Sequence, residues 1–475
     1  MQQWRSSVDK TFWQKTWRLA LPVSLQSMLF AVLGLVDVIM VSQLGESQVA
    51  AVGIGNRIVF FNFLLIVGVS GAVGVLAAQY FGAGKMEGVR RTLLQSWVCA
   101  ILLTLPFAVA YRVFPEQIVS LVSDDPSFVK HAHDYLYISG WTIIFVAIVV
   151  PLESALRAIG EAKMPTYVGL LAVVVNAVLN ALLIFGLYGF PEMGLAGAAL
   201  GTTISRAAQT AVLLIVTYIS YKKVLPKTED IEPARTPKAR KRYFTVAWPM
   251  IIHDGAWAMG VLVYSIIFAK LGVTELAIIS LLSPIEGVLI SAFFGFSVAA
   301  ATILGHELGA ENYQRAFHQS WSFLVISVSI AFIMGVSIWF SSGLVGEWLA
   351  KAQAPNLEMS LNVTLVMALG MFLKVFNMVG IGGVLRSGGD IKYSIFIDLF
   401  GQWAIGIPLA ILTGIVLGWQ LHWVLVAILA EEVVKVGLTT YRIYGRKWLK
   451  NLVNDDDSVQ SVSLVVKVDL NWRPV

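Results

Sequence analysis

The feature that most constrains this fold is an internal repeat, in which the first half of the chain matches the second half. The stretch from Ala20, ALPVSLQSMLFAVLGLVDVIMVSQLG, aligns with AWPMIIHDGAWAMGVLVYSIIFAKLG from Ala247. The same offset of 227 positions pairs Pro22 with Pro249, Ser70 with Ser297, and Gly82-Ala83 with Gly309-Ala310. An offset of 229 positions pairs LRAIGEAK from Leu156 with LRSGGDIK from Leu385. Matched markers that span most of each half indicate an internal duplication, so the fold must be built from two related units.

The composition places both units in a membrane. Of the 475 residues, 57% are hydrophobic and only 13% are charged, and the mean hydropathy is +0.76. A soluble chain carries about 25% charged residues. The apolar runs 64–78, 141–152 and 168–187 approach the roughly 20 residues that a membrane-spanning helix needs. The single cysteine, Cys99, lies in an apolar run, which excludes a disulfide within the chain and a cysteine metal site.

The hydropathy pattern predicts twelve membrane-spanning helices. We expect six in the first half, near residues 16–43, 48–80, 89–111, 131–156, 165–186 and 194–221. We expect six more near residues 244–270, 275–307, 313–340, 356–385, 392–416 and 420–443. Because each half has an even number of spans, both halves enter the membrane in the same direction, as parallel repeats. The second and eighth spans exceed one simple crossing, so we expect a tilt or a kink, which Pro284 would favour in the eighth.

The spans divide the chain into five parts. We expect an N-terminal segment at 1–15, a first lobe at 16–222, a linker at 223–243, a second lobe at 244–446 and a tail at 447–475. The linker region contains three prolines and no apolar periodicity, which is typical of a solvated connection that lets two lobes move separately. We expect the tail beyond Lys450 to be mobile, and its sequence indicates no function.

The distribution of positive charge predicts the orientation. Most of the 34 lysines and arginines lie in one alternate set of loops, in the linker and in the two terminal segments. The opposite loops hold only Arg112, Lys130, Lys270 and Lys351. Loops rich in lysine and arginine stay in the cytoplasm, so we expect both termini to be cytoplasmic and the protein to lie in the cell inner membrane.

The duplicated motifs resemble those of prokaryotic members of the multidrug and toxic compound extrusion (MATE) family. The resemblance covers residues 16–445 and rests on the paired Pro22 and Pro249 openings, on AAQYFGAGKMEGVRRT against ATILGHELGAENYQRA, and on LRAIGEAKMP against LRSGGDIKYS. It implies an all-α polytopic fold with two pseudo-symmetric six-helix lobes in a V around a central cavity. It also implies alternating access, in which amphipathic organic cations are exported in exchange for H⁺ or Na⁺. We expect no enzyme activity, no cofactor and a monomer.

Asp37 is the strongest candidate for coupling, because ionisable side chains inside spans are costly and usually functional. It lies in the first span between AVLGLV and VIMV. Eight residues separate it from Gly45, so it lies about 12 Å from the end of the helix at 1.5 Å per residue. The resemblance implies that an aspartate at this place is the cation-coupling residue. The alternative is a structural ion pair with Arg57 on the next helix, and both hold if Arg57 is a switchable partner.

Two amides of the fifth span are expected to share this site. Asn176 and Asn180 lie one helical turn apart, so their side chains share a face that should point into the bundle rather than to lipid. Hydrogen bonding between helices alone is the other interpretation, and Thr202 and Thr203 of the sixth span are candidate partners. In some family members the fifth span supplies a second aspartate. Asn180 replaces it here, which argues against a two-carboxylate Na⁺ site and favours H⁺ coupling.

The second lobe does not repeat the Asp37 carboxylate, because Tyr264 takes its place in the alignment. Asp254, Glu286 and Lys374 instead lie near the middle of the seventh, eighth and tenth spans. One cation with two carboxylates is a usual condition for burying all three, so a structural or gating salt-bridge cluster is one interpretation. A second cation or substrate site is the other. Asp398, near the start of the eleventh span, is a further candidate.

The remaining polar groups inside spans are interpreted as structural or solvated. In the last span, Lys435 is spaced to pair with Glu431 and Glu432. His306 and Glu307, at the end of the eighth span, are expected to face solvent.

Two alternatives to cation export stay open. A flippase of lipid-linked saccharides would need several cations in the central cavity to hold a pyrophosphate, and the spans offer Arg57, Arg206 and Lys374. A membrane enzyme would need clustered acidic and histidine side chains, and the one such cluster, His131 to Asp134, is typical of a polar loop. The sequence lacks a GxxxxGK[ST] phosphate loop, so ATP is not the energy source within this chain. Nothing in the charge pattern indicates a nucleic-acid partner.

Overall fold

The computed structural model describes residues 2–44, 46–120 and 126–454, and this part of the chain is helical without strands. The first-half helices are α2 (Lys10–Ser42), α3 (Glu46–Gly82), α4 (Met86–Val113), α6 (Pro126–Ala158), α7 (Lys163–Phe185) and α8 (Gly194–Ser220). The second-half helices are α10 (Pro237–Leu271), α11 (Val273–Gly309), α12 (Tyr313–Phe340), α14 (Leu357–Asn377) continued by η4 (Met378–Leu385), α15 (Ile391–Leu399) continued by η5 (Phe400–Gly406), α16 (Ile407–Ala410) and η6 (Ile411–Val416), and α17 (Leu421–Tyr444). Short elements lie between them: α1 (Gln2–Ser7), α5 (Pro115–Ser120), η1 (Leu187–Gly189), η2 (Lys222–Val224), η3 (Thr228–Asp230), α9 (Ile231–Arg235) and α13 (Ser342–Lys351).

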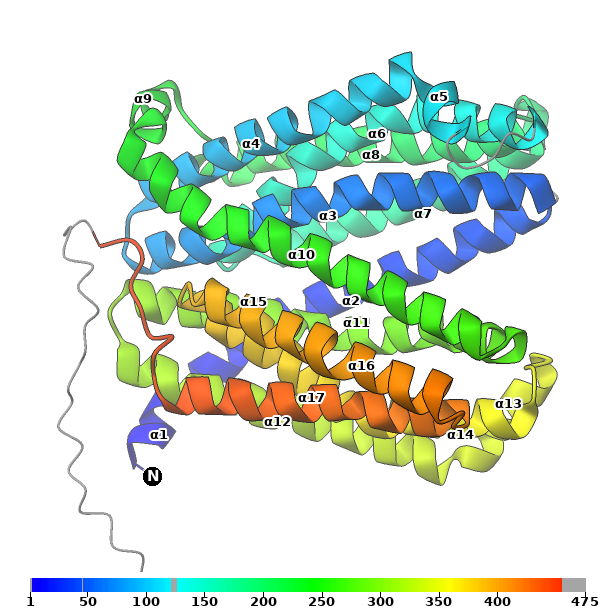
Figure 1. Cartoon of the computed structure of the whole chain (residues 1–475). Coiled ribbons are helices and arrows are strands. Elements are labelled where there is room, and N and C mark those ends of the chain that lie inside the picture. Colours follow the sequence, from blue (N-terminus) through cyan, green and yellow to red (C-terminus); the bar gives the residue numbers. More distant parts are fainter. Residues whose placement is uncertain (1, 45, 121–125, 455–475) are drawn as a thin grey trace, which may run out of the picture.

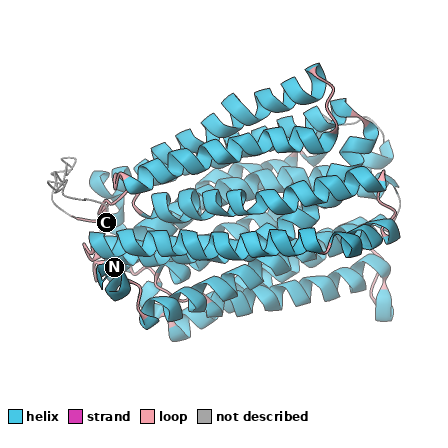
Figure 2. Ribbon diagram, turned by 90° about the horizontal axis from the view of Figure 1, so that it is seen from below, coloured by secondary structure: helices cyan, strands magenta, loops and turns pink. Residues whose placement is uncertain are grey.

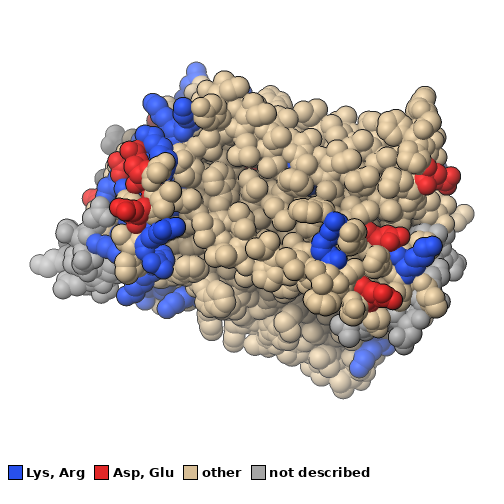
Figure 3. All heavy atoms as spheres, turned by 90° about the horizontal axis from the view of Figure 1, so that it is seen from above, with Lys and Arg blue, Asp and Glu red and all other residues tan. Residues whose placement is uncertain are grey.

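The helices are built for a membrane. Among the described residues, eleven helices are long and apolar enough to cross one, and α17 is comparable in length but carries Glu431, Glu432 and Lys435. In lipid every backbone N–H and C=O must be satisfied within the segment, which apolar helices achieve. Figure 3 shows charged side chains gathered at the two ends of the molecule, with a nearly uncharged belt between them. The chain is therefore a multi-pass membrane protein, and the predicted all-α polytopic class is confirmed.

Two long helices cross between the halves. The start of α2 packs into the core of the second half, where Phe12 and Leu19 are buried beside Phe323 of α12. The start of α10 packs reciprocally into the core of the first half, where Tyr243 and Met250 are buried. Each helix then joins its own half, so α2 and α10 run in crossed directions (Figure 1). This reciprocal exchange reflects the duplication seen in the sequence.

One end of the molecule carries α1, the connection between the halves, and the end of α17, and we call it the terminal face (Figures 1 and 2). The polar contacts that join the halves are found toward this face. They include Ser24 of α2, whose hydroxyl donates to the carbonyl of Ala292 at 2.5 Å, and Tyr243 of α10, whose hydroxyl donates to the carbonyl of Val69 at 3.1 Å.

The connection between the halves is more helical than its sequence suggests. The predicted linker ends at residue 243, but α10 already begins at Pro237. Pro237 occupies a first-turn position that needs no backbone N–H, and the Thr236 hydroxyl caps the helix by accepting from the Ala239 N–H at 3.3 Å. The prolines that suggested a flexible connection therefore include one that starts a helix.

Pro284 lies within α11, which is one continuous element. Irregular helix geometry also occurs where the sequence did not predict it, because the tenth and eleventh spans contain the π-helical segments η4, η5 and η6. Beyond α17, residues 445–454 fold back onto the terminal face rather than extending into solvent, with Trp448 and Val453 buried. The rest of the predicted tail, 455–475, lies outside the described residues.

Candidate functional site

The Asp37 carboxylate belongs to a string of hydrogen bonds that joins three helices of the first half. The Asn180 amide of α7 donates to Oδ1 of Asp37 at 2.9 Å. The Asn176 amide, one turn earlier on α7, donates to Oδ1 of Asn180 at 3.5 Å and to the Thr202 hydroxyl of α8 at 3.2 Å. Asn176 and Asn180 are buried, and Asp37 is half-buried. The structure therefore brings Asp37, Asn180, Asn176 and Thr202 together.

Close packing of α7 against α8 holds this string in place. Gly201 faces the Asn180 side chain, and a methyl group at position 201 would overlap its amide oxygen. Gly197, one turn earlier, meets the backbone of Leu183 in the same way. Small residues let membrane helices approach each other closely. The glycines of the GLAGAALG stretch thus position the amide that contacts Asp37.

Arg57 does not reach this string, so the predicted Asp37–Arg57 ion pair is wrong for this conformation. The Arg57 side chain is exposed, and the bond that the described residues make to the Asp37 carboxylate comes from Asn180 rather than from Arg57. The cation whose field acts on Asp37 is Arg206 of α8. Arg206 lies one turn beyond Thr202, donates to Gln209 at 2.8 Å, and stacks on the Phe30 ring.

A second buried polar group continues from Arg206 toward the terminal face, and the sequence analysis did not find it. Glu153 of α6 accepts from the amides of Gln26 and Gln209, both at 3.2 Å, and from Arg157 at 2.7 Å. The charges of Glu153 and Asp37 both act on Arg206. Hydrogen bonds continue from Arg206 through Gln209 to Glu153, inside an otherwise apolar bundle. A glutamate inside an apolar stretch, VVPLESAL, was the available sequence signal.

The second half contains a separate charged network. His253 of α10 lies between two carboxylates, with Asp254 at 2.9 Å from Nδ1 and Asp398 at 2.9 Å from Nε2. Lys435 of α17 lies 3.8 Å from Asp398 and forms an ion pair with Glu431. This network is extended by four further contacts, from Arg386 to His253, Lys435 to Glu432, Tyr264 to Glu431, and Asn377 to Glu432.

The predicted second-half cluster is thus divided. Lys374 forms an ion pair with Glu286, and no contact between described residues joins this pair to Asp254 or Asp398. Asp254 and Asp398 meet through His253, which the sequence analysis did not consider. The expected i+3 and i+4 pairs of Lys435 with Glu432 and Glu431 are present, although they belong to the larger network rather than standing alone.

The two halves meet at the terminal face through a pair of contacts related by the duplication. The Gln79 amide of α3 donates to the carbonyl of Ser387 at 2.7 Å, across the two halves. The residue equivalent to Gln79 in the second half is His306 of α11, 227 positions later. Nε2 of His306 lies 2.6 Å from the carbonyl oxygen of Ala158. Ala158 is equivalent to Ser387 at the offset of 229. His306 was expected to face solvent, and this contact corrects that expectation. The terminal face is therefore closed by equivalent bonds from each half.

Glycines permit this close approach. Gly82 lies against the backbone of His306, and Gly309 lies against the backbone of Gln79, so a side chain at either position would overlap the other half. These are the paired Gly-Ala positions of the sequence repeat. Their recurrence at the same offset reflects a shared packing requirement at the terminal face.

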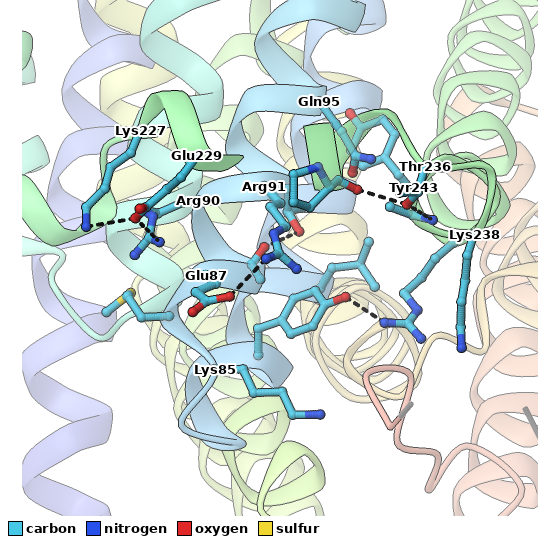
Figure 4. Close-up of a pocket in the computed structure, with 18 of the residues that line it drawn as sticks. Lys85, Glu87, Arg90, Arg91, Gln95, Lys227, Glu229, Thr236, Lys238 and Tyr243 are labelled. Carbon is cyan, nitrogen blue, oxygen red and sulfur yellow. Dashed lines mark hydrogen bonds and ion pairs between the residues drawn. The ribbon is translucent and has the colours of Figure 1, made fainter. Parts of the chain in front are cut away.

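A cavity of about 840 Å³ lies at the same face, between α4, the connection and the start of α10 (Figure 4). Its walls mix basic and acidic side chains, with Arg91 paired to Glu87 and Lys227 paired to Glu229. Beside it, Arg90 makes hydrogen bonds of 2.6 and 3.2 Å to Asp230. Burial opposes ionisation of Asp230, but the bonds and charge of Arg90 outweigh burial and lower the pKa of this carboxyl. None of the predicted coupling residues lines this cavity. The Arg90–Asp230 pair attaches the connection to α4.

Duplicated membrane-spanning helices with buried charges in both halves are an arrangement that many membrane transporters share. The MatE family model matches residues 22–182 and again residues 249–412, once in each half. The chain therefore belongs to the MATE family, whose members are transporters and not enzymes.

Known relatives and solved structures agree with this assignment. The chain is 23% identical over 455 residues to an uncharacterized transporter, YisQ, of Bacillus subtilis, covering 94% of this chain and 97% of that protein. It is 29% identical over 399 residues to the multidrug resistance protein NorM of Burkholderia vietnamiensis, covering 83% and 85%. Its fold is similar to an outward-facing MATE family multidrug transporter, with a TM-score of 0.81 at 17% identity, over 91% of this chain and 96% of that one.

Proposed function

We propose that this protein is an antiporter that exports amphipathic organic cations in exchange for H⁺. The observation that carries the proposal is the Asp37 string, in which the α2 carboxylate lies inside the membrane bundle and is bonded to the Asn180 amide. A carboxylate held in this way can accept a proton and lose it again without leaving its place in the bundle. The names of the NorM relatives support drugs as the exported class.

The partners of Asp37 suit a proton better than a sodium ion. Asn180, Asn176 and Thr202 supply one amide donor to the carboxylate and no second negative charge. When Asp37 is charged, the Asn180 N–H stabilises it, and Arg206 adds a positive field. When Asp37 is neutral, Arg206 keeps Glu153 as a counter-charge. Both protonation states of the site therefore have acceptable partners, which an exchange cycle requires.

We assign the two halves as the lobes that move. In this proposal the first lobe is 16–222, the second is 244–446, and 223–243 links them, with terminal segments at 1–15 and 447–475. The positive charge of the loops places the terminal face in the cytoplasm and the protein in the cell inner membrane. The closed terminal face and the likeness to an outward-facing transporter then support an outward-facing state. The protein is proposed to work as a monomer.

The second-half network is proposed as a gating salt-bridge cluster rather than the primary coupling site. Lys435 lies among Asp398, Glu431 and Glu432, and its positive charge disfavours a bound Na⁺ there. The Lys374–Glu286 pair is proposed to be structural. Flipping of lipid-linked saccharides is less well supported, because two of its three candidate cations, Lys374 and Arg206, are engaged with other side chains.

The coupling role of Asp37 can be tested by substrate-induced proton release. A cationic dye such as ethidium would be added to the purified protein in weakly buffered detergent solution, and the pH followed with an indicator. If substrate and proton compete, the native protein releases protons and Asp37→Asn releases none. Equal release from both proteins would remove Asp37 from the exchange step.

A further inference from the structure

The segment that follows α17 crosses the boundary between the two halves at the terminal face. Trp448 is fully buried in the core of the second half and fixes the start of this segment. Residues 449–454 then run into a crevice between two equivalent loops, the α3–α4 loop at 83–85 and the α11–α12 loop at 310–312. A cavity of about 310 Å³ in this crevice is lined by residues of both loops and of the segment. We call residues 449–454 the strap.

The strap is bonded to the first half through its backbone. The N–H of Leu452 donates to Oε1 of Gln79 at 2.6 Å, and Nε2 of Gln79 donates to the carbonyl of Lys450 at 3.1 Å. Nζ of Lys85 donates to the carbonyl of Val453 at 3.3 Å. Leu452 packs against the first-half core, and Val453 is buried. Gln79 therefore bonds both to the strap and, through Ser387, to the second half.

The strap is bonded to the second half through its side chains. The Asn451 amide donates to the carbonyl of Gly309 at 3.4 Å. The Asn454 amide donates to the Glu311 carboxylate at 2.8 Å, and Lys450 lies 3.9 Å from Asp390. The strap thus holds Gln79 of one half and Gly309 and Glu311 of the other within a single short segment.

The duplication makes this feature one-sided. The stretch equivalent to 445–454, at an offset of 227, is 218–227. That stretch stays with the first-half helices, where Val224 is buried among first-half side chains, and then continues into the connection. The Gln79 and His306 bonds are counterparts of each other, whereas the strap bonds to Gln79 and not to His306 among the contacts of the described residues.

We propose that the strap is a latch that holds the terminal face closed and must leave Gln79 before the halves can separate there. This inference rests on the proposed alternating access, because only a protein that opens at this face needs to release the latch. The reasoning is geometric. If the halves move apart, the strap cannot keep its bonds to Gln79 and Lys85 on one side and to Gly309 and Glu311 on the other.

The latch can be tested by measuring the distance between the halves. Lys163 and Lys392 are exposed, begin equivalent helices α7 and α15, and lie near the terminal face. Spin labels at K163C and K392C, in a Cys99→Ser background, would report the separation of the halves by double electron–electron resonance in lipid nanodiscs. Two truncations form a matched pair: a stop after Asn454 keeps the strap, and a stop after Leu449 removes it but keeps Trp448.

The proposal predicts that removing the strap populates the open state. Without the strap, the closed state loses the strap's hydrogen bonds and the burial of Val453. The ratio of open to closed molecules should therefore rise at least about tenfold. The stop after Asn454 should match the full chain. If the shorter protein does not fold, the full-length double variant Asn451→Ala/Asn454→Ala decides, with an expected rise of at least about threefold. Unchanged distances in whichever variant folds would overturn the latch. Because this readout involves neither export nor protons, it can fail or succeed independently of the proposed antiport.

Discussion

Replacing Asp37 by asparagine separates the coupling role of this residue from its structural role. The carboxamide keeps the shape of the side chain and keeps an oxygen that can accept from Asn180, so the 2.9 Å bond can persist. What is lost is the negative charge. Arg206 loses one counter-charge but retains the field of Glu153 and its bond to Gln209.

The size of the effect on stability follows from two opposing contributions. A charged aspartate at the centre of a span costs about 3 kcal/mol on insertion scales, and the substitution removes much of that cost. The bond from Asn180 changes from charge-assisted to neutral, which loses about 1 kcal/mol. Asp37 is half-buried, so the first contribution is reduced. We therefore expect Asp37→Asn to be as stable as the native protein, or more stable by up to about 2 kcal/mol.

Export should be abolished although stability is kept, because an amide neither binds nor releases a proton near neutral pH. The assay pairs thermal unfolding of the purified protein with dye export by energised everted vesicles. Asp37→Glu, which keeps a titratable group, is the control and should retain partial export. A well-folded Asp37→Asn protein that still exports dye against a gradient would refute this reasoning. So would a large loss of stability, because it would mean that the charge holds the bundle together.

Three further outcomes are expected. Gly201→Ala should weaken export, because the added methyl group displaces the Asn180 amide; export equal to the native rate would show that this amide is not needed. Lys435→Met should destabilise the protein by about 3 kcal/mol by leaving the charge of buried Glu431 without its cation, and adding Glu431→Gln should restore most of the loss in a melting experiment. The pKa of Asp230 is lower in the folded protein than in the unfolded chain, where it is about 4. The ion pair of Asp230 with Arg90 therefore stabilises the connection fully above the unfolded pKa. This stabilisation is lost as the pH falls through the folded-state pKa. Hydrogen exchange of residues 227–236, corrected for intrinsic rates, should therefore rise at acid pH and stay flat near neutrality.

The sequence predicted the helices well because lipid imposes a simple rule on them. A span needs about 20 apolar residues. Because of the duplication, each motif occurs in both halves, so its position in one half could be checked against the other. The same features predicted that Asn176 and Asn180 share an interior face, because the helical period fixes which side chains lie together. In the structure Asn180 donates to Asp37 and Asn176 donates to Asn180, which is the arrangement that these two signals together suggest.

The partners of the charged groups were harder to predict, because they depend on which way each helix is rotated. Arg57 and Arg206 both lie inside spans, but the charge that acts on Asp37 is that of Arg206, on the helix that packs against α7 through Gly197 and Gly201. The same reason explains the error at His306. Its position at a helix end suggested solvent, but the other half covers it.

The tail and the π-helical segments had no signal that the sequence analysis could use. Residues 449–454 have neither apolar periodicity nor a repeat partner that folds in the same way. Their place is set by contacts with Gly309, 142 positions away from Asn451, and with Gln79, 373 positions away from Leu452. Such contacts become visible only when the two halves are assembled.

The central claim, exchange of organic cations for protons, is tested most directly in proteoliposomes that contain only this protein. A cationic dye would be loaded and its efflux followed under two separate conditions: an imposed pH gradient without Na⁺, and an imposed Na⁺ gradient at equal pH on both sides. Our account predicts efflux driven by the pH gradient, and none above the leak driven by Na⁺. Efflux that follows the Na⁺ gradient and is indifferent to the pH gradient would contradict it.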